Sequence, residues 1–340
     1  MTSCRINDRA GTDAARRDSQ QAARQMTRVL VTGATGFVGA ALCELLAQAG
    51  CIVRAALRSD RPVPNCIAEK VVTGDIAAPA DLAAALAGVD AVIHAAARTH
   101  VLHESPVNTE LYMQINARGT LHLAEAAAQA GVRRFVYLSS IKVNGEETNR
   151  GYRPDDGPCP RNAYAISKWL GERHLQEVAA RTGIEAAIVR PPLVYGAGVG
   201  ANFLRLMRWV DRGWPLPFRS VHNRRSLVSV WNLGDLLVRV LMHPAASGRV
   251  WLVSDGDDLS TVDLIQRLGT AMGRRVRLLP VPVGALRAAA AVTGKAAVIE
   301  RLCGSLFVDI TQTRRDLDWT PPLSVAVGLA RTVGWYSSLR

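Results

Sequence analysis

The chain has 340 residues, which is enough for one large α/β domain or for two closely packed lobes. Hydrophobic residues make up 49% of it and charged residues 21%, the balance of an ordinary globular protein. The formal charge of +12 comes from scattered arginines without a long basic run, and only 5% of residues are aromatic, so we do not expect nucleic-acid binding. Anionic small-molecule ligands or solubility account better for the charge.

The cysteines and the apolar stretches predict a cytoplasmic protein. The six cysteines form no C-x-x-C pair and no metal-ligand spacing, so we expect reduced thiols and no metal site. Residues 1–25 lack the apolar core of a secretory signal. The apolar stretch at 283–302 contains Arg287 and Lys295, so no integral membrane segment is expected. We expect a helix packed against the protein there, and an interfacial helix is the alternative.

The first 25 residues differ in character from the rest of the chain. Residues 1–25 are polar and without periodicity, which predicts a disordered tail. Met26 directly precedes the first apolar run, so we hypothesise that translation starts there or that the tail is dispensable. From residue 28 onward, apolar strands alternate with helical patterns. Strands are expected at 28–33, 51–57, 68–75, 90–97, 133–140 and 185–196, and helices at 37–50, 81–88, 108–130 and 163–182.

This alternation predicts an α/β fold with a Rossmann-like, doubly wound parallel sheet of right-handed βαβ units. We assign residues 26–196 to a dinucleotide-binding domain. After residue 196 the alternation weakens to a helix near 200, short strands near 250 and 278, and mainly helical patterns beyond 260. Residues 197–340 are therefore expected to form mainly a small C-terminal α/β lobe that binds substrate, with some interleaving with the first domain.

The sequence GATGFVG stands between the first strand and the first helix. Gly33 permits a tight turn, Gly36 lets the backbone approach a pyrophosphate, and Gly39 lets the helix pack closely on the sheet. The helix N-terminus then offers N–H donors and the positive end of its dipole to the phosphates. The residues predicted to hold the cofactor at this loop are Gly33, Thr35, Gly36, Phe37, Val38 and Gly39.

The end of the second strand favours NADP over NAD. NAD sites usually place an acidic residue there for the ribose hydroxyls, whereas this chain has Leu57 and Arg58 and no acid before Asp60. Arg58 can bind a 2′-phosphate through charge-assisted hydrogen bonds, and Arg54 either helps it or faces solvent. NAD remains the alternative cofactor. Asp75 is either an acceptor for the adenine amine or an ordinary loop aspartate. The other predicted cofactor residues are Ile76, Ala95, Ala96, Tyr164, Lys168 and Pro191.

Tyr164 and Lys168 lie four residues apart on one predicted helix and therefore share a face. Because the chain has only six tyrosines and four lysines, this spacing rarely arises by chance, although an incidental surface pair is the alternative. An ammonium about 4 Å from the phenol would favour tyrosinate by up to ~4 kcal/mol and bring the tyrosine pKa toward neutral pH. Ser140, at the end of the fifth strand, would donate to the substrate oxygen that Tyr164 protonates. The three residues are predicted to form an acid–base group.

Several motifs follow the order found in extended short-chain dehydrogenases/reductases. They are GATGFVG at 33–39, HAAA at 94–97, NARGT at 116–120, YLSS at 137–140, YAISK at 164–168 and RPPLVYG at 190–196. Over residues 27–340 the chain resembles the nucleotide-sugar branch of that family, which is the UDP-glucose 4-epimerase-like or NAD-dependent epimerase/dehydratase family. The resemblance implies that Ser140, Tyr164 and Lys168 are catalytic, and that Asn116 helps the proton relay or the helix bend beside it.

The resemblance also implies a substrate site and an assembly. The segment NRRSLVSVWNLGDLL at 223–237 matches a family segment in which an arginine clamps a sugar-nucleotide diphosphate, which makes Arg225 the candidate clamp and Asn202 a candidate ligand nearby. Ser140 and Arg98 are further substrate candidates, and Arg98 is alternatively plain surface. The implied partner is a UDP-sugar or a lipid-diphosphate sugar, and the implied assembly is a homodimer.

The residues after Ser140 bear on the reaction. Family dehydratases carry an Asp-Glu pair there, whereas this chain has Ile141 and Lys142, so a 4,6-dehydratase is not expected. Arg58 after Leu57 favours an NADPH-dependent 4-keto reductase acting at C4 of a UDP-hexose or hexosamine during surface-polysaccharide precursor synthesis. The wider sequence is similar to UDP-4-keto-6-deoxy-hexosamine 4-reductases. The alternatives are an NAD-dependent UDP-sugar 4-epimerase and a non-catalytic NAD(P)-binding sensor or scaffold.

Overall fold

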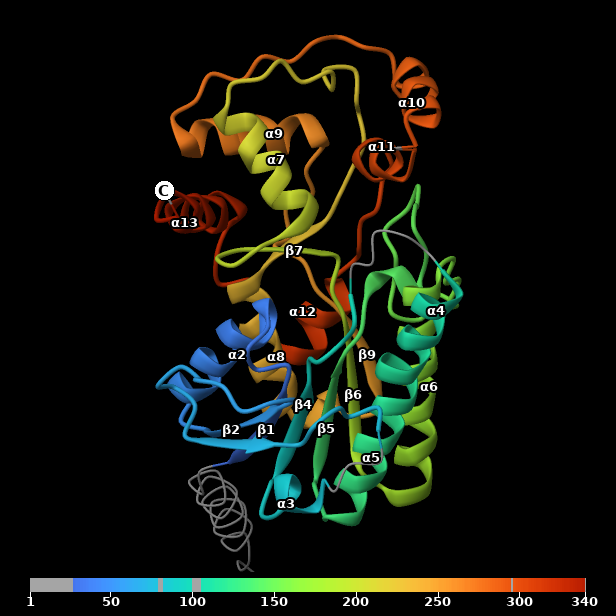
Figure 1. Cartoon of the computed structure of the whole chain (residues 1–340), viewed down its shortest axis with the longest axis vertical. Helices are drawn as coiled ribbons and strands as arrows, with labels where there is room; N and C mark the ends of the chain where they lie inside the picture. The colour runs from blue at the N-terminus through green and yellow to red at the C-terminus, as the bar shows by residue number, and fades with distance from the viewer. Residues whose placement is uncertain (1–26, 79–81, 100–104, 295, 340) are drawn as a thin grey trace, which may run out of the picture.

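The computed structural model describes residues 27–78, 82–99, 105–294 and 296–339, so the predicted tail at 1–25 lies outside the described residues. One sheet of seven parallel strands, in the order β3-β2-β1-β4-β5-β6-β9, runs through this part of the chain (Figure 1). The order reverses beside β1, as in a doubly wound sheet, which confirms the predicted fold class. The strands are β1 (Arg28–Thr32), β2 (Ile52–Leu57), β3 (Glu69–Val72), β4 (Ala91–His94), β5 (Arg134–Leu138), β6 (Glu185–Arg190) and β9 (Arg249–Leu252).

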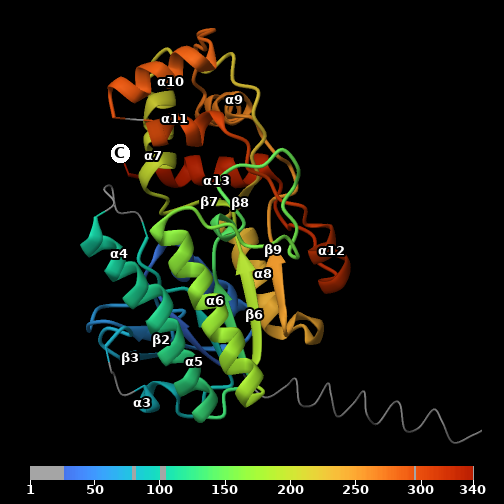
Figure 2. The same ribbon diagram turned by 90° about the vertical axis from the view of Figure 1, so that its right-hand side faces the viewer.

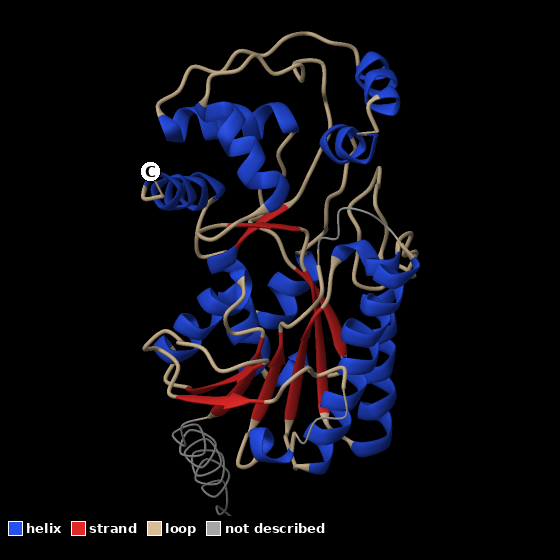
Figure 3. Ribbon diagram, in the orientation of Figure 1, coloured by secondary structure: helices blue, strands red, loops and turns tan. Residues whose placement is uncertain are grey.

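Helices cover both faces of the sheet (Figure 3). Alternate residues of β1 enter two different cores, because Val29 and Val31 pack on one face of the sheet and Leu30 packs on the other. The first core is closed by α2 (Phe37–Gln48), α8 (Val230–Met242) and α12 (Thr311–Leu317). The second core is closed by α3 (Ala83–Leu86), α5 (Gly119–Gln129) and α6 (Ala163–Thr182).

Two strand predictions need correction. The strand expected near residue 250 for the C-terminal lobe is β9, which pairs with β6 as the seventh strand of the main sheet. The strand expected at 185–196 divides after Arg190, because Pro191 and Pro192 lack the N–H groups that a central strand donates. Its second part, β7 (Leu193–Tyr195), leaves the sheet and pairs with β8 (Leu227–Ser229).

The helix expected at 108–130 consists of three segments. It begins with α4 (Pro106–Tyr112), continues as a π-helical turn, η1 (Met113–Arg118), and ends with α5 before Gly131, whose φ is 76°. A π-helical turn inserts an extra residue and redirects backbone carbonyls, so it is often found at functional sites. The helix at 163–182 is predicted correctly, because Asn162 caps its first turn and Gly183 ends it at φ 79°.

The C-terminal lobe covers the carboxyl ends of the sheet strands (Figures 1 and 2). Its helices enclose a third core that includes Phe203, Leu206, Leu264 and Leu329. The strand expected near 278 is only a single bridge between Leu216 and Leu278. None of the helices in the described residues is long and apolar enough to cross a bilayer. The helices of the lobe are α7 (Ala201–Asp211), α9 (Thr261–Met272), α10 (Val283–Val292), α11 (Ala296–Cys303) and α13 (Val325–Ser337), and short 3-10 turns are η2 (Ile141–Val143) and η3 (Pro244–Ala246).

Candidate active site

A cavity of about 460 Å³ lies at the carboxyl ends of β1, β2 and β4. The chain extends the sheet from β1 through β2 to β3 and then places β4 on the other side of β1. The cavity therefore occupies the switch point at which doubly wound sheets bind their ligands. It is lined by the predicted residues Gly33, Thr35, Gly36, Arg58, Asp75, Ile76, Ala95, Ala96 and Arg98.

The three loop glycines have different tasks. A Cβ on Gly33 (φ 72°) would lie 2.7 Å from the Ala96 nitrogen, and a Cβ on Gly39 would collide with the Gly33 carbonyl. These two glycines are required by the fold. A Cβ on Gly36 would have only the Gly33 oxygen within 4 Å, at 3.2 Å, so Gly36 keeps room free at the loop. Gly36 also caps α2 without a side-chain acceptor for its first-turn N–H groups. This cradle therefore fits a dinucleotide pyrophosphate.

Some predicted cofactor residues do not line this cavity. Phe37 and Val38, in the first turn of α2, are partly buried and pack against hydrophobic cores, so only their backbone groups face the loop. The carbonyl of Pro191 accepts a hydrogen bond from the Ile141 nitrogen at 3.0 Å, which ties β6 to the turn after Ser140.

The adenosine end of the cavity holds two arginines. Arg58 follows β2 as predicted, and Arg61, which the sequence interpretation missed, lines the same cavity. Arg54 does not help them, because its Nε is 2.5 Å from a Glu69 carboxylate oxygen and its Nη1 donates to helix carbonyls. Asp75 lines the cavity and also accepts from the Ala77 nitrogen at 3.0 Å, so it shapes its own loop.

Ser140, Tyr164 and Lys168 come from two elements that meet beside the sheet. Ser140 follows β5 and is 8% exposed, and its side chain lowers the pKa of the Tyr164 phenol. Tyr164 and Lys168 share one face of α6, where Lys168 is only 1% exposed. The Lys168 ammonium lies 4.1 Å from the centre of the Tyr137 ring, a cation–π contact. The structure therefore brings the predicted acid–base group together.

The electrostatics of this group differ from the sequence prediction. Burial raises the pKa of Tyr164 to about 12, although the side chain of Ser140 opposes the rise. Lys168 is not among the groups that shift this pKa. Burial also lowers the pKa of Lys168 to about 7, with the nearby carboxylate of Glu172 acting in the opposite direction. The prediction that the ammonium lowers the tyrosine pKa was therefore wrong for the protein alone, because desolvation is the largest influence on the pKa of each group.

Asn116 joins the cofactor cavity to α6 from within the π-helical turn. Its side-chain oxygen accepts from the Arg98 nitrogen at 2.8 Å, and its amide donates to the Arg98 carbonyl at 3.1 Å. The same amide donates to the Ser167 hydroxyl at 3.0 Å, one residue before Lys168. Asn116 thus positions two segments of the site at the predicted helix bend.

A buried polar chain behind the cavity was not found from the sequence. The Thr32 hydroxyl lies 2.6 Å from His94 Nδ1, and His94 Nε2 lies 3.1 Å from the Thr120 hydroxyl. Thr120 donates to the Asn116 carbonyl at 2.7 Å, and the His94 ring stacks on Tyr137. Burial lowers the pKa of His94 to about 3, so this histidine is neutral and structural. It links β1, β4 and the π-helical turn without taking part in proton transfer.

A buried ion pair supports the group from the other side. Arg190 donates from two nitrogens to the Glu172 carboxylate, at 2.9 and 2.5 Å, and from a third to Asn144 at 3.0 Å. The Ser139 hydroxyl also donates to Glu172. Ser139 directly precedes Ser140, and Glu172 follows Lys168 by one helical turn. The spacing of Glu172, four residues after Lys168, was the available sequence signal.

Comparison with known proteins agrees with this geometry. The family model described as NAD dependent epimerase/dehydratase family matches residues 29–254, which is well over half of the chain. This chain belongs to that family. A UDP-glucose 4-epimerase of Vibrio cholerae is 40% identical over 309 residues, covering 89% of this chain and 94% of the relative. The N-acetyl-alpha-D-glucosaminyl-diphospho-ditrans,octacis-undecaprenol 4-epimerase of Escherichia coli O157:H7 is 27% identical and covers 90% of this chain and 94% of that protein.

Solved structures of the epimerase/dehydratase family share the fold. MoeE5 in complex with UDP-glucose and NAD has a TM-score of 0.75 and 27% identity, covering 92% of this chain and 100% of that one. The UDP-glucuronic acid 4-epimerase from Bacillus cereus, in complex with NAD, has a TM-score of 0.74 at 22% identity, covering 92% of this chain and 99% of that one. This membership makes the chain an NAD(P)-dependent enzyme of the extended short-chain dehydrogenase/reductase type.

The predicted substrate residues of this family member are spread over three elements. Arg98 lines the cofactor cavity, and its guanidinium donates to Asn108 at 3.3 Å. Arg225 lies in the C-terminal lobe, where it donates to the carbonyls of Arg301 at 2.6 Å and Gly304 at 2.9 Å. Asn202 lies half-buried in the first turn of α7. Their contact with a substrate remains a prediction.

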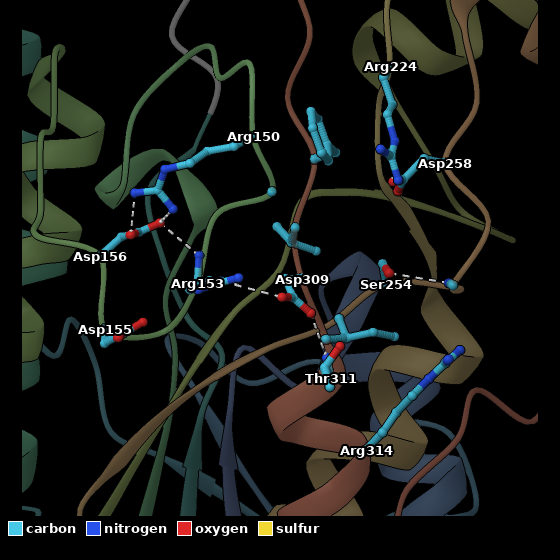
Figure 4. Close-up of a pocket in the computed structure, with 15 residues that line it drawn as sticks. Arg150, Arg153, Asp155, Asp156, Arg224, Ser254, Asp258, Asp309, Thr311 and Arg314 are labelled. Carbon is cyan, nitrogen blue, oxygen red and sulfur yellow. Dashed lines mark hydrogen bonds and ion pairs between the residues drawn. The ribbon is translucent and has the colours of Figure 1, made fainter.

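A second and larger cavity, of about 680 Å³, lies among the loop at 150–156, the loop at 254–258 and the segment at 307–314 (Figure 4). Four arginines and four aspartates line it. Arg150 pairs with Asp156 at 2.7 Å and Arg224 with Asp258 at 2.8 Å, and these pairs largely neutralise the charge. The predicted catalytic and cofactor residues do not line it. Its volume alone therefore does not make it the active site.

Proposed function

We propose that this chain is a nucleotide-sugar 4-epimerase that oxidises and then re-reduces C4 of a UDP-linked hexose or hexosamine while it retains NAD. The observation that carries the proposal is that Ser140, Tyr164 and Lys168 form one group in a fold whose glycine loop fits a dinucleotide. The nearly full-length similarity to the Vibrio cholerae UDP-glucose 4-epimerase supports the substrate class.

The proposed chemistry assigns a proton position to each residue of the group. The nicotinamide coenzyme, when bound, supplies hydride acceptance and hydride donation. Tyr164 accepts the O4 proton while C4 is oxidised to the ketone, and returns a proton to O4 while C4 is reduced. Ser140 donates a hydrogen bond to the same oxygen and holds the hydroxyl of Tyr164 in line. Glu172, one helical turn after Lys168, favours the ammonium form of that lysine by raising its pKa.

Coenzyme retention distinguishes a 4-epimerase, which keeps NAD bound through the reaction, from a 4-keto reductase, which consumes NADPH. The purified protein is denatured, the released coenzyme is identified by mass, and the native protein is incubated with UDP-glucose or UDP-N-acetylglucosamine without added coenzyme. If the protein is an epimerase, the denatured sample yields NAD, and the native protein converts one of the two sugars to its 4-epimer without added coenzyme. Protein without bound coenzyme, together with no conversion when NAD is added, contradicts the proposal.

The second candidate is an NADPH-dependent 4-keto reductase, and the two arginines of the cavity favour it. Arg58 and Arg61 line the end where a 2′-phosphate would lie, and Arg54, the third arginine of this region, is already paired. Arg58→Ala should then raise the Kd for NADPH about tenfold and leave the Kd for NADH within about twofold. Equal changes for both coenzymes would count against 2′-phosphate recognition.

The carrier, the assembly and the location are also inferred. We infer that the sugar is carried on UDP or on a lipid diphosphate, because the family relatives include both kinds by name. The family resemblance implies a homodimer, and the cysteine pattern favours the cytoplasm. Light scattering of the purified full chain tests the assembly, and about twice the 36.6 kDa chain mass is expected.

A further inference from the structure

Two stretches of the C-terminal lobe hold most of the chain's excess charge. Residues 201–222 and 273–303 contain ten Arg and Lys against two Asp and Glu, a net +8 out of +12 for the whole chain. We call the described part of these two stretches the distal surface. Within the described residues, only one of its nine arginines forms an ion pair, Arg274 with Asp211 at 3.3 Å. The nine exposed arginines are Arg205, Arg208, Arg212, Arg219, Arg274, Arg275, Arg277, Arg287 and Arg301.

The distal surface also exposes large apolar side chains. Trp214 is 51% exposed, Leu279 is 47% exposed and Val292, at the end of α10, is 89% exposed. Of the ten residues of α10, only Leu286 and Ala290 are buried. The expected helix therefore packs against the protein, but α10 contacts the lobe only through one narrow stripe.

The two stretches are held together at one end of the molecule. The Leu216 nitrogen donates to the Arg277 carbonyl at 2.9 Å, and the Leu279 nitrogen donates to the Leu216 carbonyl at 2.9 Å. Figures 1 and 2 show the paired loops and α10 at the end of the lobe farthest from the sheet. Neither of the two described cavities reaches this end. The distal surface thus lies apart from both of these cavities.

We propose that the distal surface docks the protein on an anionic lipid bilayer. Unpaired arginines attract anionic headgroups, and Trp and aliphatic side chains insert at the boundary between headgroups and acyl chains. The α10 helix, with ten residues, is far too short to span a bilayer and long enough to lie in its surface. A nucleic acid would be better matched by a groove with stacked aromatic rings, and Trp214 is the only exposed large aromatic of the described chain.

The distal surface adjoins the candidate substrate residue Arg225. The Arg225 guanidinium donates to the carbonyl of Arg301 in α11, the eight-residue helix that follows α10. A helix of that length spans about 12 Å, so docking would bring the diphosphate end of the site near the bilayer. This step, unlike the docking itself, rests on the proposed function. If the sugar is carried on a lipid diphosphate, the arrangement places the substrate site next to the membrane that holds that lipid.

The test is sedimentation of the full chain with sucrose-loaded vesicles. Vesicles of phosphatidylcholine with about one third phosphatidylglycerol are compared with pure phosphatidylcholine at low and high salt. The protein should bind the anionic vesicles at low salt, dissociate from them at high salt, and not bind the neutral vesicles. Arg275→Ala with Arg277→Ala should weaken binding about tenfold or more, and Val292→Asp about fivefold. Protein that stays in the supernatant with anionic vesicles overturns the proposal.

The matched control removes two exposed arginines from the opposite end of the molecule. Arg133→Ala with Arg181→Ala should change vesicle binding by less than about twofold, because these residues flank the amino ends of β5 and β6. An equal loss in both double variants would mean that net charge alone drives adsorption. A change in molar mass by light scattering in Val292→Asp would instead assign the surface to a second copy. UDP-sugar turnover is measured in every variant, so failure of the proposed function is seen independently of vesicle binding.

Discussion

Glu172 and Arg190 form a two-point ion pair that is 2% and 6% exposed, one helical turn after Lys168. The pair connects α6, which holds Tyr164 and Lys168, with β6. Through Ser139 it also reaches the end of β5, where Ser140 stands. The relative position of the two proton-transfer elements therefore depends on a carboxylate that touches neither substrate nor coenzyme.

Replacement of Glu172 by glutamine should have a structural and a chemical effect. The substitution leaves the Arg190 charge buried without its partner, so the free energy of unfolding should fall by about 3–5 kcal/mol. Because Glu172 raises the pKa of Lys168, its loss should also lower that pKa below about 7. The alkaline decline of kcat should then begin at a lower pH. Urea unfolding and a pH–rate profile measure the two effects.

The control for this prediction is Glu177→Gln on the same helix. Glu177 pairs with Arg173 at 3.1 Å, and both side chains are more than half exposed. Such a surface pair contributes at most about 0.5 kcal/mol. A pH profile that is unchanged in Glu172→Gln would limit this residue to a structural role.

Tyr164→Phe should remove turnover and preserve the fold. The phenylalanine keeps the ring packing against Tyr112 and loses only the hydroxyl that exchanges the proton with O4. We expect kcat to fall by about 10²-fold or more, with coenzyme content and melting temperature close to those of the wild type. Tyr336→Phe is the matched control, because it removes a tyrosine hydroxyl that donates to Asp211 in the C-terminal lobe at 3.2 Å, outside the acid–base group. Near-normal turnover in Tyr164→Phe would reject the assignment of the proton donor.

The elements that the sequence predicted well are those with local signals. The helix at 163–182 has Asn162 at its start and Gly183 at its end. The turn of the glycine loop is indicated by Gly33, whose positive φ favours glycine. The order of the motifs predicted the family, whereas the acid–base role of Ser140, Tyr164 and Lys168 stays a prediction. These features depend on neighbours in the chain, so a single sequence is sufficient to find them.

The features that the sequence missed depend on contacts between distant segments. β9 joins the sheet because β6 offers an open edge, and its own four residues do not distinguish a sheet strand from a lobe strand. Arg54 turns to Glu69 on β3, which alternation alone did not decide. The balance of desolvation and attraction at Tyr164 depends on burial, which motif spacing does not report.

Gly36→Ala and Gly39→Ala should separate binding from folding. A methyl group on Gly39 meets the Gly33 carbonyl, so one of the two backbones must move and the variant should lose about 2 kcal/mol or more of stability. A methyl group on Gly36 approaches only the Gly33 oxygen, at 3.2 Å, and should cost little stability. It would occupy the space into which a pyrophosphate fits, so the Kd for coenzyme should rise about tenfold or more. Equal coenzyme binding by Gly36→Ala and the wild type would place the pyrophosphate elsewhere.

Lys168→Met should make the protein inactive and more stable. Burial lowers the pKa of Lys168 to about 7, below its usual value of 10.5, so between these values the unfolded chain binds the proton that the folded chain lacks. The lysine therefore destabilises the fold most fully below about pH 7, and this penalty disappears as the pH rises toward 10.5. At pH 7 the variant should melt roughly 3–6 °C above the wild type, and the difference should shrink by pH 10. Lys142→Met, at a partly exposed lysine paired with Glu146, should show no such dependence. A stability difference that is constant from pH 7 to 10 would mean that the buried amine is not the titrating group, and that Lys168 keeps its charge beside Tyr164 throughout this range.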